Sequence, residues 1–236
     1  MNKKKFQNIS SNKKIIFLFG PPGSGKSTQA KMIAEKFGFY YFATSVIAKE
    51  YIASHDDPKT KEQEIIYKKG ELLDAKWLFE IIKQKTKEIL KKELNGIVYE
   101  GSPRTLYEAK NMFGFLSESL GKENIITIKI EASECELKKR LTKRLLCDKN
   151  SSHIFIEGEF EEGAVCPNKD GGKLYKRDLD DFNIFKIRMR EYKTKTEEGI
   201  NFLKTKGSII VVNGEQTQKK VFKEILEKIK RKINGC

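Results

Sequence analysis

The stretch GPPGSGKS, residues 20–27, decides the fold class of this chain of 236 residues. It fits the pattern G-x-x-x-x-G-K-[ST] and stands between an apolar run, residues 15–19, and a helical pattern, residues 29–37. Glycines in such a loop let successive backbone N–H groups surround a polyphosphate, and the following helix N-terminus adds positive potential. Lys26 would reach the terminal phosphates, and the Ser27 hydroxyl would ligand Mg²⁺. The flanking strand and helix argue against the alternative, a turn rich in glycine and proline that binds nothing.

Composition and charge restrict the class of protein further. A hydrophobic content of 38% in a chain of this length predicts one main domain with room for insertions. The net charge of +14 comes from Lys-rich stretches without interleaved aromatic residues. Such stretches are typical of solvated helix faces and steer anionic nucleotides, so we expect no nucleic-acid partner, although a basic balance alone would also suit one. No apolar run is long enough to span a bilayer, and the four cysteines are too sparse for a disulfide framework. We expect a cytoplasmic monomer with no membrane partner.

Short runs rich in β-branched and aromatic residues alternate with helical patterns along the chain. The runs are Ile15–Phe19, Phe39–Phe42, Ile97–Tyr99, Ile125–Ile130 and Ser208–Val212. Several lack the polar alternation of a half-exposed strand, which is expected for parallel strands covered by helices on both faces. The pattern predicts an α/β fold, a P-loop doubly wound five-stranded parallel sheet.

Local signals predict where several helices begin and end. Gly38 closes the helix after the phosphate loop, and Gly121 closes a later one. Ser133 and Glu136 form a capping box for a helix that we expect to run to Leu145.

Two segments interrupt the strand and helix alternation and are interpreted as modules that close over a site at the carboxyl ends of the strands. The predicted divisions are a disordered basic tail at 1–13, a core at 14–43, 74–142 and 181–236, an acceptor-binding insertion at 44–73 and a lid insertion at 143–180.

A second motif, EGSPRT at residues 100–105, follows the third predicted strand directly. A carboxylate at a strand end, here Glu100, can orient the water shell of a Mg²⁺ ion. Gly101 lets a ligand approach the backbone, and Arg104 offers a bidentate fork for a second phosphate.

Together these motifs resemble the adenylate kinase family, long-lid type, over residues 14–229. The resemblance rests on GPPGSGKSTQA at 20–30, EGSPRT at 100–105, Arg140 and Arg144 in KKRLTKR, Arg177 and Arg188 eleven residues apart, and VNGEQ at 212–216. It implies a nucleoside monophosphate kinase that transfers the γ-phosphoryl group of Mg-ATP to AMP and yields two ADP.

The resemblance also assigns site residues, position by position. The ATP-binding residues would be Gly23, Ser24, Gly25, Lys26, Ser27, Thr28, Arg140, Arg144 and the backbone of Gln216. The acceptor-binding residues would be Thr44, Lys49, Glu71, Leu72, Leu73, Gly101, Ser102, Pro103, Arg104, Glu108, Arg177 and Arg188. The catalytic cations would be Lys26, Arg104, Arg144, Arg177 and Arg188. Mg²⁺ would be held by Ser27 and, through water, by Glu100.

The chemistry agrees with these roles independently. Transfer between two polyanions needs mainly charge neutralisation and in-line positioning, and the acceptor phosphate oxygen is already ionised. No general base is required, which suits a chain whose only histidines are His55 and His153. For any one arginine taken alone, a surface ion pair is the simpler interpretation. The order and spacing of the motifs favour the catalytic one.

Several positions depart from the family pattern. Ser27 and Thr28 follow the loop lysine, where the family has Gly-Thr, Glu100 replaces an Asp, and Ser102 replaces a Phe. On the acceptor side Lys49 stands in place of an Arg, which keeps the charge but loses the fork. Val46 stands where an Asp is common.

Glu108 occupies the position of the Gln that reads the adenine edge in the family. An ionised Glu only accepts hydrogen bonds, whereas adenine presents a donor beside an acceptor. Guanine presents two adjacent donors, so GMP is the first alternative acceptor, and a protonated Glu108 would still suit AMP. Alternatively Glu108 pairs with a neighbouring lysine and never meets the base. A rival from another class is a nucleotide-binding regulatory protein without efficient turnover, against which Arg104, Arg177 and Arg188 argue.

The lid carries the spacing C-x5-H-x12-C-x3-D, made by Cys147, His153, Cys166 and Asp170. Long-lid relatives often hold a structural metal here, and tetrahedral Zn²⁺ accepts all three ligand types. Asn150 lies where a second cysteine usually falls. The alternatives are a structural zinc and a hydrogen-bonded polar cluster of the kind found in metal-free relatives.

Overall fold

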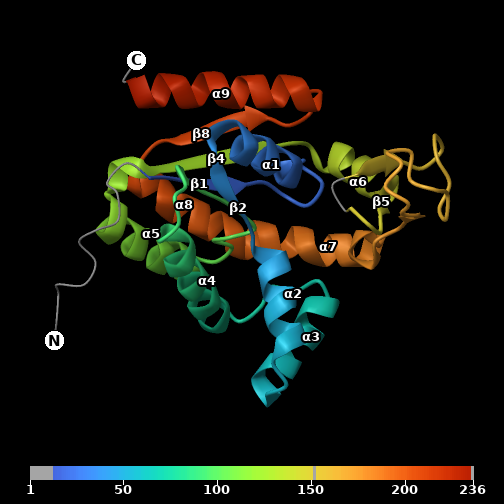
Figure 1. Ribbon diagram of the computed structural model, residues 1–236, viewed down its shortest axis with the longest axis horizontal. Coiled ribbons are helices and arrows are strands. Elements are labelled where there is room, and N and C mark those ends of the chain that lie inside the picture. The colour runs from blue at the N-terminus through green and yellow to red at the C-terminus, as the bar shows by residue number, and fades with distance from the viewer. Residues whose placement is uncertain (1–12, 151–152, 235–236) are drawn as a thin grey trace.

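A parallel β-sheet of five strands forms the centre of the protein (Figure 1). The computed structural model describes residues 13–150 and 153–234. The strands are β1 (Lys14–Phe19), β2 (Phe39–Ala43), β3 (Gly96–Glu100), β4 (Ile125–Glu131) and β8 (Ile209–Asn213). Their order is β2-β3-β1-β4-β8, and every neighbouring pair is parallel. The predicted fold class and the five predicted strands are confirmed.

Helices cover both faces of this sheet, and β1 shows why its sequence lacks polar alternation. Ile15 and Phe17 belong to one buried cluster, whereas Ile16 and Leu18 belong to the other. The first cluster lies under α4 (Ala75–Leu90), α5 (Leu106–Leu120) and α8 (Glu197–Lys206). The second lies under α1 (Lys26–Phe37) and α9 (Gln218–Asn234). Side chains of a strand point alternately to its two faces, so a strand covered on both sides is apolar throughout.

Two insertions extend from the core at different places (Figure 1). The first, between β2 and α4, consists of α2 (Thr44–Ser54) and α3 (Pro58–Lys68). The second follows α6 (Glu134–Thr142) and contains a three-stranded antiparallel sheet in the order β6-β5-β7. Its strands are β5 (Arg144–Cys147), β6 (Ile154–Ile156) and β7 (Leu174–Tyr175). The chain returns to the core through a 3-10 turn (Asp178–Asp180), α7 (Phe182–Glu191) and a π-helical turn (Tyr192–Thr196) that leads into α8.

Two glycine helix ends are as predicted. Gly38 is left-handed, with φ 65°, and its N–H donates to Ala34. Gly121 has φ 87° and donates to Ser117. Both conformations put the backbone at positive φ, which glycine adopts without steric cost.

The predicted extent of α6 is wrong at its end. Ser133 does cap the helix, but its own N–H donates to Glu215 at 2.7 Å, and the Glu136 carboxylate binds Arg140 instead of closing the capping box. The helix ends at Thr142, and Leu145 lies in β5. Leu145 is fully buried in the small lid core, so tertiary packing there overrides helix propensity.

The tail proposed for 1–13 lies outside the described residues except for Lys13. That residue is buried, and its Nζ donates to the carbonyl oxygens of Leu90, at 2.8 Å, and Lys92. Lys13 therefore belongs to the folded core and not to a tail.

Two glycine substitutions should change the stability of the fold in opposite directions, and the first of them tests the register of β1 against β3. A Cβ at Gly96 would overlap the carbonyl oxygen of Lys14, whereas a Cβ at Gly114 in α5 would meet nothing within 4 Å. We expect Gly96→Ala to lower the free energy of unfolding by about 2 kcal/mol or more, and Gly114→Ala to raise it by about 0.5–1 kcal/mol. Urea denaturation measures both. An unchanged midpoint for Gly96→Ala would contradict the register.

Candidate active site

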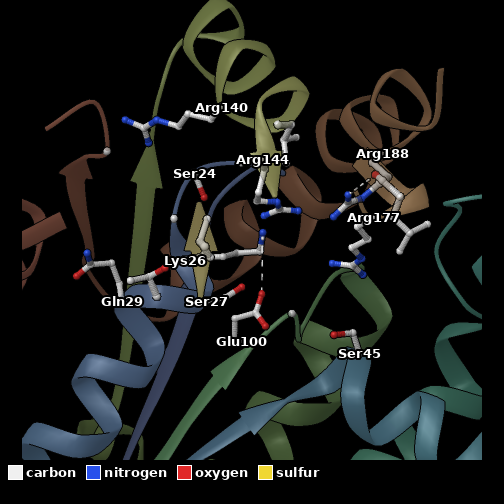
Figure 2. A pocket seen from close by; sticks show the side chains of 18 of the residues that line it. Ser24, Lys26, Ser27, Gln29, Ser45, Glu100, Arg140, Arg144, Arg177 and Arg188 are labelled. Atoms are coloured by element: carbon white, nitrogen blue, oxygen red, sulfur yellow. Dashed lines mark hydrogen bonds and ion pairs between the residues drawn. The ribbon is translucent and has the colours of Figure 1, made fainter. Parts of the chain in front are cut away.

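A cavity of about 560 Å³ lies at the carboxyl edge of the sheet. Its wall includes the loops after β1 and β3, the α6–β5 segment, the start of the α2–α3 insertion and α7. Figure 2 shows the side chains of Lys26, Ser27, Glu100, Arg144, Arg177 and Arg188 facing one space from these separate elements. Parallel strands end at the same edge, which is why motifs far apart in the sequence meet here.

The loop between β1 and α1 has the backbone of an anion site. Gly23 and Gly25 lie at φ 85° and 84°, and α1 begins immediately afterwards at Lys26. An added Cβ at Gly23 would press against the Leu137 carbonyl oxygen at 3.0 Å, so the close approach requires glycine. The Ser24 hydroxyl is buried and has no hydrogen-bond partner within the described part of the chain. All six residues predicted here, 23–28, line the cavity. The free N–H groups of the helix start and the unpaired hydroxyl fit a phosphate group.

Lys26 lines the same cavity together with the five arginines Arg104, Arg140, Arg144, Arg177 and Arg188. Burial, helped by the nearby arginines and opposed by Glu100, lowers the pKa of Lys26 to about 7. Burial together with Arg177 and Arg104 lowers the pKa of Arg188 to about 10. A polyphosphate would reverse these shifts because it stabilises the charged forms. The cavity therefore favours a highly anionic ligand.

Asp180 holds two of these arginines in place. It accepts from Arg144 Nε and Nη2 at 2.7 and 2.6 Å, and its carboxylate lies 3.7 Å from Arg188 Nη1. Arg188 also donates to the Leu179 carbonyl oxygen at 2.8 Å. The sequence analysis missed Asp180, although an acidic run three residues after Arg177 was an available signal. Arg140, at the cavity wall, is paired with Glu136.

Two oxygen groups beside Lys26 suit a hard divalent cation. Glu100 Oε1 lies 4.0 Å from Lys26 Nζ, and Ser27 extends into the same space (Figure 2). The hydroxyl of Tyr41 donates to the other Glu100 oxygen at 3.4 Å. A carboxylate and a hydroxyl on the phosphate side of the cavity are the donor types that Mg²⁺ takes, usually with several waters retained.

Most of the predicted acceptor residues line the cavity as well. They are Thr44, Glu71, Leu72, Leu73, Gly101, Arg104, Glu108, Arg177 and Arg188. Ser102 and Pro103 instead border a smaller adjoining cavity, where Ser102 Oγ accepts from Thr44 Oγ1 at 2.9 Å. Lys49 is exposed, and its Nζ lies 5.5 Å from the centre of the Tyr67 ring. Tyr67, which was not predicted, does line the cavity.

Glu108 is 1% exposed and caps the helix on which it sits. Thr105 Oγ1 accepts from the Glu108 N–H, while the Glu108 carboxyl accepts from Thr105 Oγ1 and from the Arg104 N–H, both at 3.1 Å. Burial raises the pKa of Glu108 to about 7, although these hydrogen bonds oppose the shift. The structure describes no ion pair between Glu108 and a lysine, so the alternative pairing is not found.

Gln216 lines the cavity from the loop between β8 and α9. Its amide nitrogen donates to Glu224 at 2.6 Å and to the Asn213 carbonyl oxygen at 3.1 Å. The side chain is thus occupied, which leaves the backbone of this loop to meet a ligand.

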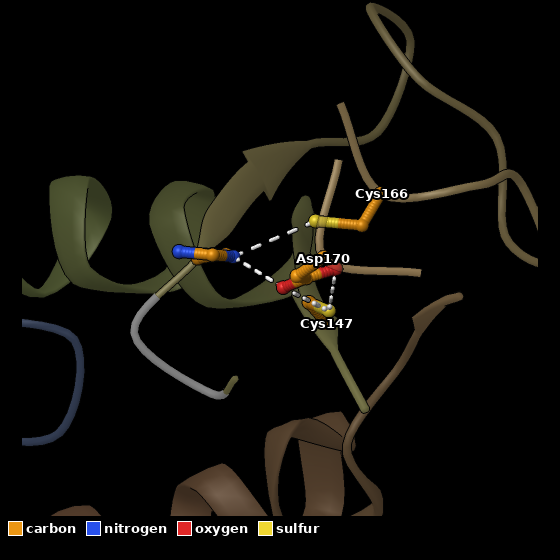
Figure 3. Close-up of side chains that lie close together, drawn as sticks. Cys147, Cys166 and Asp170 are labelled. Carbon is orange, nitrogen blue, oxygen red and sulfur yellow. Dashed lines mark hydrogen bonds and ion pairs between the residues drawn. The ribbon is translucent and has the colours of Figure 1, made fainter. Parts of the chain in front are cut away.

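A second cluster lies in the lid, where Cys147, His153, Cys166 and Asp170 come together (Figure 3). Their ligand atoms all lie within 4.8 Å of one another. Asp170 is 2.7 Å from His153 Nδ1 and 3.2 Å from Cys147 Sγ, and Cys166 Sγ is 3.5 Å from His153 Nδ1. Two sulfurs, one imidazole and one carboxylate at this separation fit a tetrahedral Zn²⁺ ion.

Comparison with known proteins agrees with this geometry. The family model described as adenylate kinase matches residues 18–208. The chain belongs to the adenylate kinase family. It is 35% identical over 221 residues to an adenylate kinase of Archaeoglobus fulgidus, covering 92% of this chain and 99% of the relative. It is 33% identical to one of Methanothrix thermoacetophila, with coverages of 89% and 95%, and 32% identical to one of Thermosipho africanus, with coverages of 92% and 99%. Adenylate kinases are phosphotransferases, so the family gives the cavity its reaction class.

The position of Lys26 predicts how this adenylate kinase responds to loss of the loop lysine. Lys26→Ala should reduce kcat by about 100-fold or more, or about 2.7 kcal/mol, because a preorganised charge is removed from the transferring group. Lys36→Ala, on the exposed side of the same helix, is the control. Coupled ADP formation measures activity, and circular dichroism checks the fold. A folded Lys26→Ala variant with more than a tenth of the activity would exclude a catalytic role.

Proposed function

We propose that this adenylate kinase transfers the γ-phosphoryl group of Mg-ATP to AMP, with the phosphate loop as the donor site and the α2–α3 side of the cavity as the acceptor site. The observation that carries the proposal is the convergence of Lys26, Arg104, Arg144, Arg177 and Arg188 on one cavity between these two sides. A cavity with this charge suits two phosphate chains that meet end to end.

In the proposed reaction an ionised oxygen of the AMP phosphate forms a bond to the γ-phosphorus as the bond to the β-γ bridging oxygen breaks. The bridging oxygen leaves with the electron pair as part of ADP, and no proton has to be moved. Lys26 and Arg188 stabilise charge on the transferring group, Arg104 and Arg177 hold the acceptor phosphate, and Arg144 faces the donor from the lid. Ser27 and, through water, Glu100 would hold Mg²⁺, which would supply further neutralisation of charge on the donor phosphates.

The two insertions would close over the substrates and exclude water, which otherwise competes with AMP for the phosphoryl group. Transfer to another monophosphate, GMP first, is the second candidate because of Glu108. A nucleotide-binding regulatory protein without efficient turnover would not require so many cations at one point, which argues against this alternative.

A coupled ADP-formation assay with AMP, GMP, CMP and UMP tests the proposal. AMP should give the highest kcat/KM. A higher kcat/KM for GMP would support the second candidate, a GMP kinase. No ADP formation with any of the four monophosphates would support a nucleotide-binding regulatory protein.

Glu108→Gln should raise kcat/KM for AMP relative to kcat/KM for GMP. The amide donates to the adenine ring nitrogen and accepts from its amino group, whereas an ionised Glu108 repels that nitrogen. One such buried pairing is worth about 1–3 kcal/mol, so the ratio of kcat/KM values should change by roughly 5-fold to 150-fold. Glu118→Gln, on the exposed face of the same helix, is the control.

The pKa of about 7 adds a pH dependence to the wild-type enzyme. Below that pH the protonated carboxyl can donate to adenine, so AMP activity should fall as the pH rises through 7, and Glu108→Gln should lose this dependence. An unchanged AMP to GMP ratio with the same pH profile in both enzymes would place Glu108 outside base recognition.

We further propose that Cys147, His153, Cys166 and Asp170 hold a structural Zn²⁺ ion. The surrounding core is small, since Leu145, Leu174 and the two cysteines make up its buried cluster. A metal would supply the stability that so small a module cannot obtain by burial alone.

Protein purified without chelator should contain about one equivalent of zinc, and Cys147→Ser should lower it. Cys135→Ser changes an exposed cysteine on α6 and is the matched control. Chelation should lower the melting temperature of the wild type. Sub-stoichiometric metal together with an unchanged melting temperature on chelation would instead support the metal-free polar cluster.

The proposed setting is a cytoplasmic monomer whose partners are ATP and a nucleoside monophosphate, without nucleic acid or membrane. None of the helices in the described ranges combines the length and apolar character that a membrane span requires.

A further inference from the structure

Tyr67, near the end of α3, connects two of the acceptor-side cations. Its hydroxyl oxygen lies 3.3 Å from Arg177 Nη2, and the Lys49 Nζ lies 5.5 Å from its ring centre. Arg177 follows the lid, 110 residues further along the chain. Tyr67 and Arg177 both line the main cavity, whereas Lys49 is exposed and lies next to the Tyr67 ring, outside the cavity lining.

Packing against the hydrophobic core fixes the ring of Tyr67. It is partly buried and packs against the large core cluster under α4, which includes Leu73 and Leu78. A ring fixed in this way loses little conformational entropy when it orients a neighbour, because a tyrosine side chain has few rotatable bonds.

The cations around the cavity differ in their partners. Arg144 and Arg140 are paired with the carboxylates of Asp180 and Glu136. Among the described residues, no carboxylate oxygen lies within 4.0 Å of the charged nitrogens of Lys49 or Arg177. Lys49 instead lies over the ring face of Tyr67, and Arg177 donates to its hydroxyl oxygen.

This difference matters for binding an anion. A carboxylate that orients a cation also cancels its charge and competes with an incoming phosphate. An aromatic face attracts a cation through its quadrupole, and a phenol oxygen accepts a hydrogen bond, and neither carries a formal charge. Tyr67 can therefore hold two cations in place while their full charge remains for the ligand.

We propose that Tyr67 is a positioning residue for the acceptor, which presents Arg177 and Lys49 to the phosphate of the nucleoside monophosphate. The inference rests on the proposed phosphoryl transfer and adds that acceptor affinity, and not ATP affinity, depends on this side chain. Tyr67→Phe removes the hydroxyl contact to Arg177 and keeps the ring under Lys49. Tyr67→Leu removes both.

Steady-state kinetics with AMP and ATP varied separately test the proposal. Tyr67→Phe should raise the KM for AMP by about 3-fold to 10-fold, the effect of one hydrogen bond to a charged group, and should leave the KM for ATP within about 2-fold. Tyr67→Leu should raise the KM for AMP further. Tyr51→Phe is the control, because Tyr51 lies in the same insertion but stacks on His55 at 3.8 Å, outside the cavity wall.

A double-mutant cycle with Arg177→Lys asks whether the hydroxyl acts through Arg177. The lysine cannot reproduce the fork geometry, so Tyr67→Phe should have little further effect in the Arg177→Lys background. Additive effects, or equal rises in both KM values, would overturn the proposal.

Calorimetric AMP dissociation constants for the same variants separate this inference from the proposed function. A wild type that makes no ADP would refute the transfer reaction, whereas AMP affinity that is unchanged in both Tyr67 variants would refute only the role of Tyr67. Tyr67→Phe keeps the ring and its packing, so it remains informative if Tyr67→Leu does not fold.

Discussion

Mutual repulsion among partly buried cations is the constraint on which this structure depends. Lys26, Arg104, Arg144, Arg177 and Arg188 line one cavity, and burial together with like charges lowers the pKa values of Lys26 and Arg188. Such a group is unfavourable unless carboxylates neutralise part of it or a bound polyanion does. The parallel sheet makes the arrangement possible because it fixes the backbone at its carboxyl edge, so repulsion between side chains is resisted by a core that is already packed.

The compensating carboxylates are unevenly distributed among these cations. Glu100 faces Lys26, and Asp180 holds Arg144 in a bidentate pair beside Arg188. Arg177 instead donates a hydrogen bond to the Tyr67 hydroxyl oxygen. Full neutralisation would leave a cavity with no preference for phosphate, whereas no neutralisation would disfavour bringing these cations together. The partial balance seen here keeps the cations close together and still favours an anionic ligand.

The sequence predicted the sheet and the phosphate loop because both are coded locally. Residues 20–27 contain the glycines that the loop conformation requires, and the apolar strands read directly as buried on both faces. It did not predict Asp180 or Tyr67, whose contacts span 36 and 110 residues. Pairings at that range depend on how the insertions fold back on the core. The prediction for the end of α6 was wrong for the same reason. Leu145 lies in β5 and packs in the lid core, and helix propensity alone does not reveal this strand.

Glu108 shows how one local motif can limit a functional one. Its two carboxyl oxygens already accept from the Arg104 N–H and the Thr105 hydroxyl, and so complete the N-terminal cap of α5. Each oxygen has only its second lone pair, or the proton of the neutral acid, left for a base in the cavity. Capping favours the ionised form, whereas burial favours the neutral one, and burial has the larger effect on the pKa. If Glu108 reads the acceptor base as proposed, the protonation state of this buried carboxyl links the stability of a helix start to recognition of that base. A glutamine, which has one oxygen and one amide, would supply the two functions from separate atoms.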